Sequence, residues 1–167
     1  MQRRALPVAL ITYQPIGMIR SPFPNVQGMP IQAAFAQGVK GTVVLDEDYA
    51  VGLEGLDGFS HVILIYHFHL SEGYQLRVRP FLGEEMHGVF ATRAPRRPNA
   101  IGISVVRLDR VEGRTLYVSG LDIVDGTPVL DIKPYVPQFD DRGDARIGWL
   151  EERIHRARIR KADDRFG

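Results

Sequence analysis

Apolar residues recur at every second position along most of this chain, and a period of two is typical of β-strands rather than helices. The clearest case is the stretch IGISVVRLDRVEGRTLYVS at 101–119, where two alternating runs flank Glu112-Gly113. A short break containing glycine between two such runs predicts a hairpin. Shorter runs of the same kind lie at 13–23, 40–49, 74–81 and 87–92. Strands at this close spacing, with few helices, predict a mainly β protein whose single antiparallel sheet closes into a barrel.

Two further patterns refine the predicted sheet. The most apolar stretch, SHVILIYHFHL at 60–70, predicts a strand that is buried on both faces. Asp125-Gly126 predicts a second hairpin turn, because Asp-Gly favours tight turns between strands. The glycine-rich VGLEGLDGFS at 51–60 predicts a compact turn or a one-turn helix.

Only the end of the chain shows helical spacing. Leu150, Ile154 and Ala157 follow one another at i, i+4 and i+7, with Glu151 and Glu152 in the first turn and basic residues in the last turn. This arrangement favours a C-terminal α-helix of about three turns, because the charges complement the helix dipole. We therefore expect an N-terminal leader at 1–15, one barrel domain at 16–146 and a basic C-terminal helix at 147–167.

The composition excludes several classes of site. The chain has 167 residues and no cysteine, which rules out disulfides, thiolate metal sites and cysteine nucleophiles and fits a cytoplasmic protein. No apolar run approaches the roughly 18 residues of a membrane-spanning helix. The formal net charge of +1 gives no overall basic field. Recognition of any anion must therefore come from local clusters of charge.

One such cluster is RAPRRPNAIG at 93–102, which holds three arginines and two prolines in its first six residues. Pro95 and Pro98 fix their own φ angles and favour extended backbone at the preceding residues, so the loop should be stiff. Guanidinium groups bind carboxylates and phosphates through paired hydrogen bonds. The loop therefore predicts an anion site. The alternative is that one arginine pairs with an acidic residue across the sheet and the others are solvated.

Histidines form a second cluster. If 60–70 is one regular strand, His61, His67 and His69 share a face, and the His-x-His pattern could hold a metal ion. No carboxylate follows at close spacing, so histidines lining a polar cleft are the favoured interpretation, and we predict no metal.

A third cluster lies in LDIVDGTPVLDIKPY at 121–135. Asp122 and Asp131 could face one cleft across the Asp-Gly turn, where a carboxylate could act as a general base. An ion pair between Asp131 and Lys133 is the structural alternative. No Gly-x-Gly-x-x-Gly pattern is present, which argues against a Rossmann-type site.

The segment GVFATRAPRRPNAIGISVVRL at 88–108 resembles the signature of the TsaA-like family. Four other pieces match in order, so that the resemblance covers 16–137: IGMIRSPF, GLDGFSHVILIYHFH, VRPFLG and GLDIVDGTPVLDIKPYVP. It implies a single β-barrel that binds S-adenosyl-L-methionine and forms a homodimer, with the cofactor near the dimer interface. The implied reaction is methylation of N6 in threonylcarbamoyladenosine, next to the tRNA anticodon. Ala100 stands where the family usually has proline, and we expect a short form without the extra C-terminal domain of the characterised bacterial enzyme.

The resemblance also implies which residues form the site. The implied cofactor-binding residues are Ala33, Ala34, Phe35, His69, Leu70, Arg93, Ile103, Ser119, Gly120, Leu121 and Asp122. The implied substrate-binding residues are Arg96, Arg97, Asn99 and Lys133. The group that takes the proton from the acceptor would be Asp122, Asp131 or His69.

The acceptor is less constrained than the methyl donor. Five basic residues between Arg153 and Lys161 could track tRNA phosphates, or could form a solvated helix face. Two alternatives to a tRNA methyltransferase stay open: the same barrel acting on a small-molecule acceptor, and a non-catalytic protein that binds S-adenosyl-L-methionine.

Overall fold

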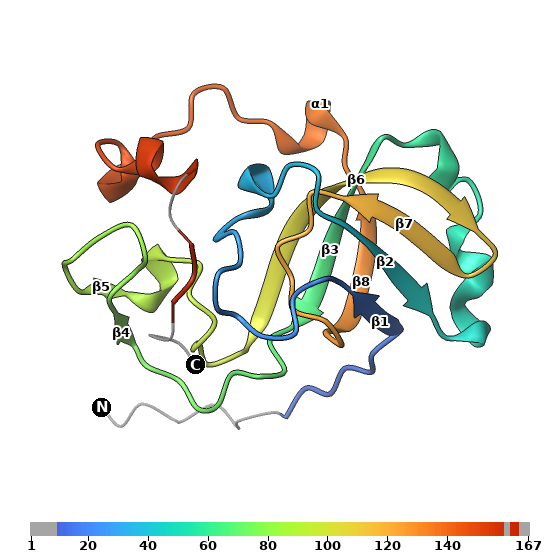
Figure 1. Ribbon diagram of the computed structural model, residues 1–167, viewed down its shortest axis with the longest axis horizontal. Helices are drawn as coiled ribbons and strands as arrows, with labels where there is room; N and C mark the ends of the chain where they lie inside the picture. The colour runs from blue at the N-terminus through green and yellow to red at the C-terminus, as the bar shows by residue number, and fades with distance from the viewer. Residues whose placement is uncertain (1–9, 159–160, 164–167) are drawn as a thin grey trace, which may run out of the picture.

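The computed structural model describes residues 10–158 and 161–163. Its main feature is a closed antiparallel barrel with the strand order β1-β2-β7-β6-β3-β8, which confirms the predicted fold class (Figure 1). The barrel strands are β1 (Gly17–Arg20), β2 (Lys40–Leu45), β3 (His61–His67), β6 (Ile101–Glu112), β7 (Thr115–Ser119) and β8 (Pro128–Pro134). A small lobe beside the barrel contains the two-stranded sheet of β4 (Arg77–Val78) and β5 (His87–Gly88). In the described part of the chain, no helix is long and apolar enough to cross a membrane.

The two-residue period produces the barrel because alternate side chains point inward. On β6 the residues at 102, 104, 106 and 108 are buried, whereas those between them are exposed. Inward residues of the other strands complete the core: Ile19, Val43, Leu45, Val62, Leu64, Leu116, Val118 and Val129. The small lobe has a separate cluster of Val78, Val89 and Ala94.

The apolar stretch at 60–70 differs from the prediction in two ways. Ile63 and Ile65 are only half-buried, because they lie on the outer face of the barrel. The strand also ends at His67, where the N–H of Phe68 donates to the carbonyl of Ala100 and the chain leaves the sheet. The prediction of a strand buried on both faces is therefore wrong, and His69 does not continue the strand.

Of the two predicted hairpins, only one forms. Glu112-Gly113 joins β6 to β7, which pair directly, and Gly113 has a positive φ of 56°. Asp125-Gly126 is a turn, but β7 pairs with β2 and β6, whereas β8 pairs with β1 and β3. The physical reason is that Asp125 holds β1 instead: its carboxylate accepts the N–H of Ser21 and contacts Arg20.

The helical segments are short. They are the α-helix α1 (Pro137–Asp140) and the 3-10 helices η1 (Ala33–Phe35), η2 (Glu47–Leu53), η3 (Leu56–Gly58), η4 (Val89–Ala91), η5 (Gly148–Leu150) and η6 (Ile154–Arg158). The described part of the tail therefore contains η5 and η6 rather than one three-turn α-helix, and residues 161–163 are not helical. Contacts with the small lobe fix this tighter path: Trp149 stacks on His87, and Arg153 lies 3.8 Å from Glu85.

The close approach of β1 to β2 at Gly17 gives a test of barrel closure. A Cβ at Gly17 would lie 2.3 Å from the carbonyl oxygen of Val44, and backbone atoms at this distance must separate. We expect Gly17→Ala to lower the free energy of unfolding by about 1–3 kcal/mol in urea titrations, as overpacking does. Gly52→Ala is the control, because no atom lies within 4 Å of that position. Equal stability of the two variants would contradict this account of closure.

Candidate functional site

Segments far apart in the sequence enclose a cavity of about 480 Å³ between the barrel and the small lobe. They are the loop 25–32, residues 66–71 from the end of β3, the arginine-rich loop 92–97, the start of β6, the segment 122–127, and residues 162–163 of the tail. Most of these side chains are apolar, and a few polar groups point inward. Such a volume and lining are typical of sites for small molecules and cofactors.

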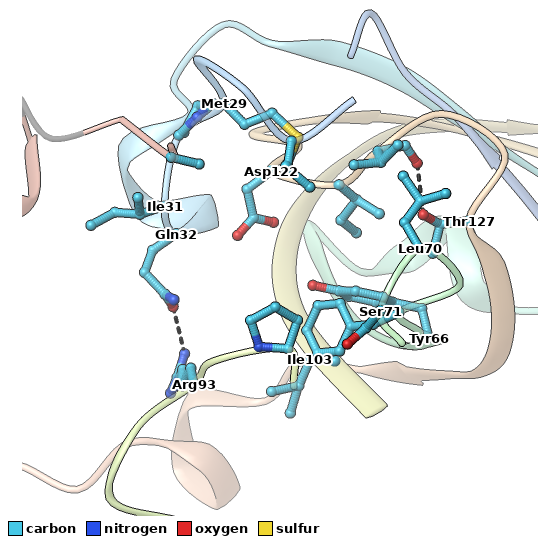
Figure 2. Close-up of a pocket in the computed structure, with 18 of the residues that line it drawn as sticks. Met29, Ile31, Gln32, Tyr66, Leu70, Ser71, Arg93, Ile103, Asp122 and Thr127 are labelled. Atoms are coloured by element: carbon cyan, nitrogen blue, oxygen red, sulfur yellow. Dashed lines mark hydrogen bonds between the residues drawn. The ribbon is translucent and has the colours of Figure 1, made fainter. Parts of the chain in front are cut away.

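Asp122 is a buried acidic group that points into this cavity (Figure 2). It lies there because Leu121 and Ile123 on either side are inserted into the core. The Ser104 hydroxyl donates to its Oδ1 at 2.7 Å. Burial raises the pKa of Asp122 to about 6, although the hydrogen bonds from Ser104 and the backbone and the charge of Arg93 favour the ionised form. A carboxylate with this pKa can take up a proton near neutral pH.

Arg93 lies on the opposite side of the cavity from Asp122 (Figure 2). Its Nη1 donates to Oε1 of Gln32 at 2.9 Å, which orients the guanidinium at the cavity rim. Arg97 holds the loop: its Nη1 donates to the carbonyls of Thr92 and Ala94 at 3.1 and 3.0 Å. Arg96 does not line the cavity, and its carbonyl accepts the N–H of Gln75.

His69 and Leu70 follow the end of β3 and line the cavity. The Nδ1 of His69 lies 3.3 Å from the hydroxyl of Thr127. Burial and the neighbouring His67 lower the pKa of His69, which favours the neutral form of its ring. Within residues 10–158 and 161–163, no three acidic, histidine or cysteine side chains gather as metal ligands.

The other predicted catalytic carboxylate lies outside the cavity. Asp131 forms an ion pair of 2.7 Å with Lys133, and neither residue lines the cavity. The expectation that Asp122 and Asp131 share a cleft is wrong, because Asp125-Gly126 does not pair β7 with β8. The ion pair considered as the alternative is what the structure contains.

Several implied binding residues also lie away from the cavity. Ile103 lines it, but the lining residues include none of Ala33, Ala34, Asn99, Ser119, Gly120 and Leu121, although the backbone N–H of Ala33 hydrogen-bonds the Asp122 carboxylate. The side chain of the implied Phe35 lies outside the described part of the structure. Leu121 is fully buried in the core, and the Ser119 hydroxyl donates to Asp109. The structure instead brings in Ile31 and Gln32, just before the predicted residues, together with Tyr66 and Thr127.

The tail forms a further wall that sequence patterns did not indicate. On one side Trp149 Nε1 donates to the carbonyl of Ala91. On the other side the backbone of Ala162 pairs with Gly28 and Met29 through hydrogen bonds of 3.0 and 2.9 Å. Ala162 and Asp163 thereby reach the cavity. The predicted phosphate-tracking surface includes Arg156, Arg158 and Arg160, whose side chains the structure does not describe.

Comparison with known proteins identifies the architecture. Residues 18–141 match the tRNA-methyltransferase O N-terminal domain. The chain belongs to this family. The match confirms the resemblance that the segment 88–108 indicated, and it includes both Arg93 and Asp122.

Individual relatives support the same assignment. The chain is 53% identical over 157 residues to a probable S-adenosyl-L-methionine-binding protein of Pyrococcus abyssi, with 94% of this chain and 85% of the relative covered. It is 39% identical over 143 residues to the tRNA (adenine(37)-N6)-methyltransferase of Mus musculus, covering 81% of this chain but only 33% of the mouse protein. The crystal structure of TrmO from Pseudomonas aeruginosa matches with a TM-score of 0.72 and 44% identity, over 84% of this chain and 63% of that one. The chain thus spans less than two thirds of the solved protein.

The buried carboxylate in the cavity gives a test by stability. Asp122 has a pKa of about 6 in the fold against 3.8 for a free side chain, so the folded protein holds its proton more tightly. The free energy of unfolding should therefore fall as the pH rises from about 4 to about 6, by up to about 3 kcal/mol. Asp122→Asn lacks this ionisation, so its stability relative to wild type should increase over the same interval in denaturant titrations. Asp144→Asn, an exposed control, should track wild type. Parallel curves for Asp122→Asn and wild type would contradict the burial of this charge.

Proposed function

We propose that this chain is an S-adenosyl-L-methionine-dependent methyltransferase that methylates N6 of threonylcarbamoyladenosine next to the tRNA anticodon. The cavity is its methyl-donor site. The observation that carries this proposal is the charge pattern of the cavity, with Arg93 at one side, Asp122 at the other and apolar walls between them. S-adenosyl-L-methionine combines a carboxylate, a cationic sulfonium and an aromatic base, and each finds a complementary surface there. The names of the relatives support both the cofactor and the reaction.

Each residue of the cavity has a distinct task in this proposal. The cofactor supplies an activated methyl group, so the protein mainly provides alignment, which can be worth roughly 7–11 kcal/mol. Arg93, oriented by Gln32, binds the carboxylate of the cofactor. The apolar walls exclude water from the reacting atoms. Asp122 takes the proton that the acceptor nitrogen must lose, and neutral His69 is the second group able to do so.

The acceptor would approach the rim that carries the arginine-rich loop. Arg96 and Asn99 are near Arg93 in the sequence of this stiff loop and are suited to the threonyl carboxylate or to anticodon phosphates. Arg97 lines the cavity from the same loop, and its Nη1 donates to two loop carbonyls. A tRNA acceptor would place the protein in the cytoplasm.

The functional unit in this proposal is a homodimer. Ile101, Ile103 and Val105 project from the outer face of β6 with 40%, 51% and 40% of their surface exposed. They lie opposite His67, Ile65 and Ile63 of β3, so the apolar side chains are continuous across two strands. Such a patch on a soluble protein favours an interface. Because Ile101 and Ile103 also line the cavity, a second copy seated there would cover its open side.

The reaction is tested with purified protein, S-adenosyl-L-methionine and two tRNAs that differ only in threonylcarbamoylation of the adenosine beside the anticodon. We expect mass spectrometry of the nucleosides to show one added methyl group in the modified tRNA alone. Binding of the cofactor without any methylated nucleoside would remove the tRNA reaction and leave a small-molecule acceptor or a non-catalytic role. Absence of cofactor binding would contradict the whole proposal.

Removal of Arg93 tests the donor site. Arg93→Ala loses a charge-assisted hydrogen bond, which typically costs about 1.5–3 kcal/mol, or roughly a 10- to 150-fold rise in the Kd for S-adenosyl-L-methionine by calorimetry. Arg79→Ala, an exposed arginine outside the cavity, is the matched control and should bind as wild type does. An affinity of Arg93→Ala within twofold of wild type would show that the donor binds elsewhere.

A charge on the outer face of β6 tests the dimer. Val105→Glu leaves the cavity lining intact, and we expect it to convert a dimer into a monomer of 18.8 kDa in sedimentation velocity. Val51→Glu introduces the same charge at a residue that is 68% exposed elsewhere and should stay dimeric. A monomeric wild type, or a dimer unaffected by Val105→Glu, would contradict this interface.

A further inference from the structure

Behind Asp122 lies a chain of two buried hydroxyl groups. The Tyr66 hydroxyl lies 3.0 Å from the Ser104 hydroxyl, which in turn donates to Oδ1 of Asp122 at 2.7 Å. Tyr66 and Ser104 are 5% and 4% exposed. An ionised carboxylate only accepts hydrogen bonds, so the single proton of Ser104 points to Asp122. The Ser104 oxygen then accepts from Tyr66, and both donors are directed toward the carboxylate.

The position of the Tyr66 ring is built into the barrel. β3 and β6 pair Tyr66 with Gly102, and a Cβ at Gly102 would lie 2.3 Å from that ring. The absence of a side chain at 102 therefore leaves the space that the ring occupies. Phe68 meets the ring edge-on at 5.4 Å between centroids. Burial and the charge of Asp122 raise the pKa of Tyr66, so its hydroxyl stays protonated and remains a donor.

The hydrogen-bonded hydroxyl groups of Tyr66 and Ser104 place polar atoms in the barrel core. Gly102 and Ser104 occupy two successive inward positions of β6, and Val106 and Leu108 follow them along the same face. The Tyr66 ring fills the space beside Gly102, and an apolar side chain at 104 would fill the barrel without burying the Ser104 hydroxyl group. Buried polar groups are costly unless their hydrogen bonds are complete. Here the hydrogen bonds run in one line to Asp122 and end at the cavity. The hydrogen bonds to Asp122 are therefore the structural reason for burying the hydroxyl groups of Tyr66 and Ser104.

We propose that Tyr66 and Ser104 are positioning residues, which aim the Asp122 carboxylate into the cavity and stabilise its ionised form for proton uptake during methyl transfer. This inference rests on the proposed function. In the step concerned, a bond forms between the acceptor nitrogen and the methyl carbon, and the bond from that carbon to the donor sulfur breaks. The N–H bond of the acceptor also breaks, its electron pair stays on nitrogen, and the proton passes to Asp122. After product release the proton is lost to solvent.

Other groups also face Asp122 and limit the size of the effect. The Arg93 charge and a backbone N–H at Ala33, in η1, both favour its ionised form. His69 and Asp163 line the same cavity from the end of β3 and from the tail. Loss of Ser104 or Tyr66 should therefore shift the titration of Asp122 upward without abolishing it.

The test follows the Asp122 carboxyl directly by carbon-13 NMR of the full chain, without cofactor, in wild type, Ser104→Ala and Tyr66→Phe. Ser104→Ala removes the hydrogen bond itself, and we expect its midpoint to rise by about one pH unit. Tyr66→Phe removes only the outer donor and should give a smaller rise. The acid limb of the kcat profile should move in the same order, while the KM of Ser104→Ala for S-adenosyl-L-methionine stays within about twofold, because Ser104 does not line the cavity. Tyr117→Phe, on β7 and outside the cavity, is the control and should change neither quantity.

The outcomes separate this inference from the proposed function. Unmoved Asp122 midpoints in both variants would overturn the positioning role, whatever the activity. If wild type transfers no methyl group, the proposed reaction is contradicted, and the kcat profiles cannot be measured. If Ser104→Ala does not fold, Tyr66→Phe carries the NMR measurement, and Ser104→Thr, which keeps the hydroxyl, should titrate as wild type.

Discussion

Closure of the barrel through β1 is the constraint on which the site depends. β1 is only four residues long, yet it pairs with β2 on one edge and with β8 on the other. β1 also holds the segment 122–127, which precedes β8: the N–H of Ile19 donates to the carbonyl of Thr127, and the N–H of Gly126 donates to the carbonyl of Ile19. This segment carries Asp122 into the cavity. If β1 separated from its neighbours, the carboxylate and the loop at 25–32 would lose their common support.

The cavity combines two surfaces that the chain builds in different ways. The Asp122 side is made of barrel residues whose positions follow from inward packing. The Arg93 side is a loop held by two prolines, by Arg97 and by the small lobe, and the tail joins that lobe to the loop at 25–32. A carboxylate and a guanidinium thus face one apolar space from opposite sides, and the charge of Arg93 favours the ionised form of Asp122. S-adenosyl-L-methionine carries both a carboxylate, which complements Arg93, and a cationic sulfonium, which complements Asp122.

Local patterns in the sequence predicted what depends on neighbouring residues. Alternation predicted the strands, Glu112-Gly113 predicted the hairpin between β6 and β7, and the prolines at 95 and 98 indicated a constrained loop. Strand partners are a different matter, because barrel closure sets them over long distances. Asp131 was placed beside Asp122 on the assumption that a turn joins paired strands, and β7 and β8 are not paired.

The tail could not be predicted for another reason. Ala162 contacts the loop at 25–32 through backbone hydrogen bonds. Backbone hydrogen bonds do not depend on the identity of the side chains, so the sequence pattern does not predict them. Gln32 lies one residue before the implied Ala33, an offset that only the fold resolves. The resemblance to the family implied Arg93 and Asp122, but it did not indicate that Tyr66, Gly102 and Ser104 form one structural unit beside the carboxylate.

A crystal structure of the chain with S-adenosyl-L-homocysteine, the product of methyl transfer, tests the central claim most directly. The account predicts electron density for the ligand in the cavity, with its carboxylate on Arg93 and its sulfur on the side of Asp122. Density at any other place on the barrel, or a ligand in the cavity that contacts neither residue, would contradict it.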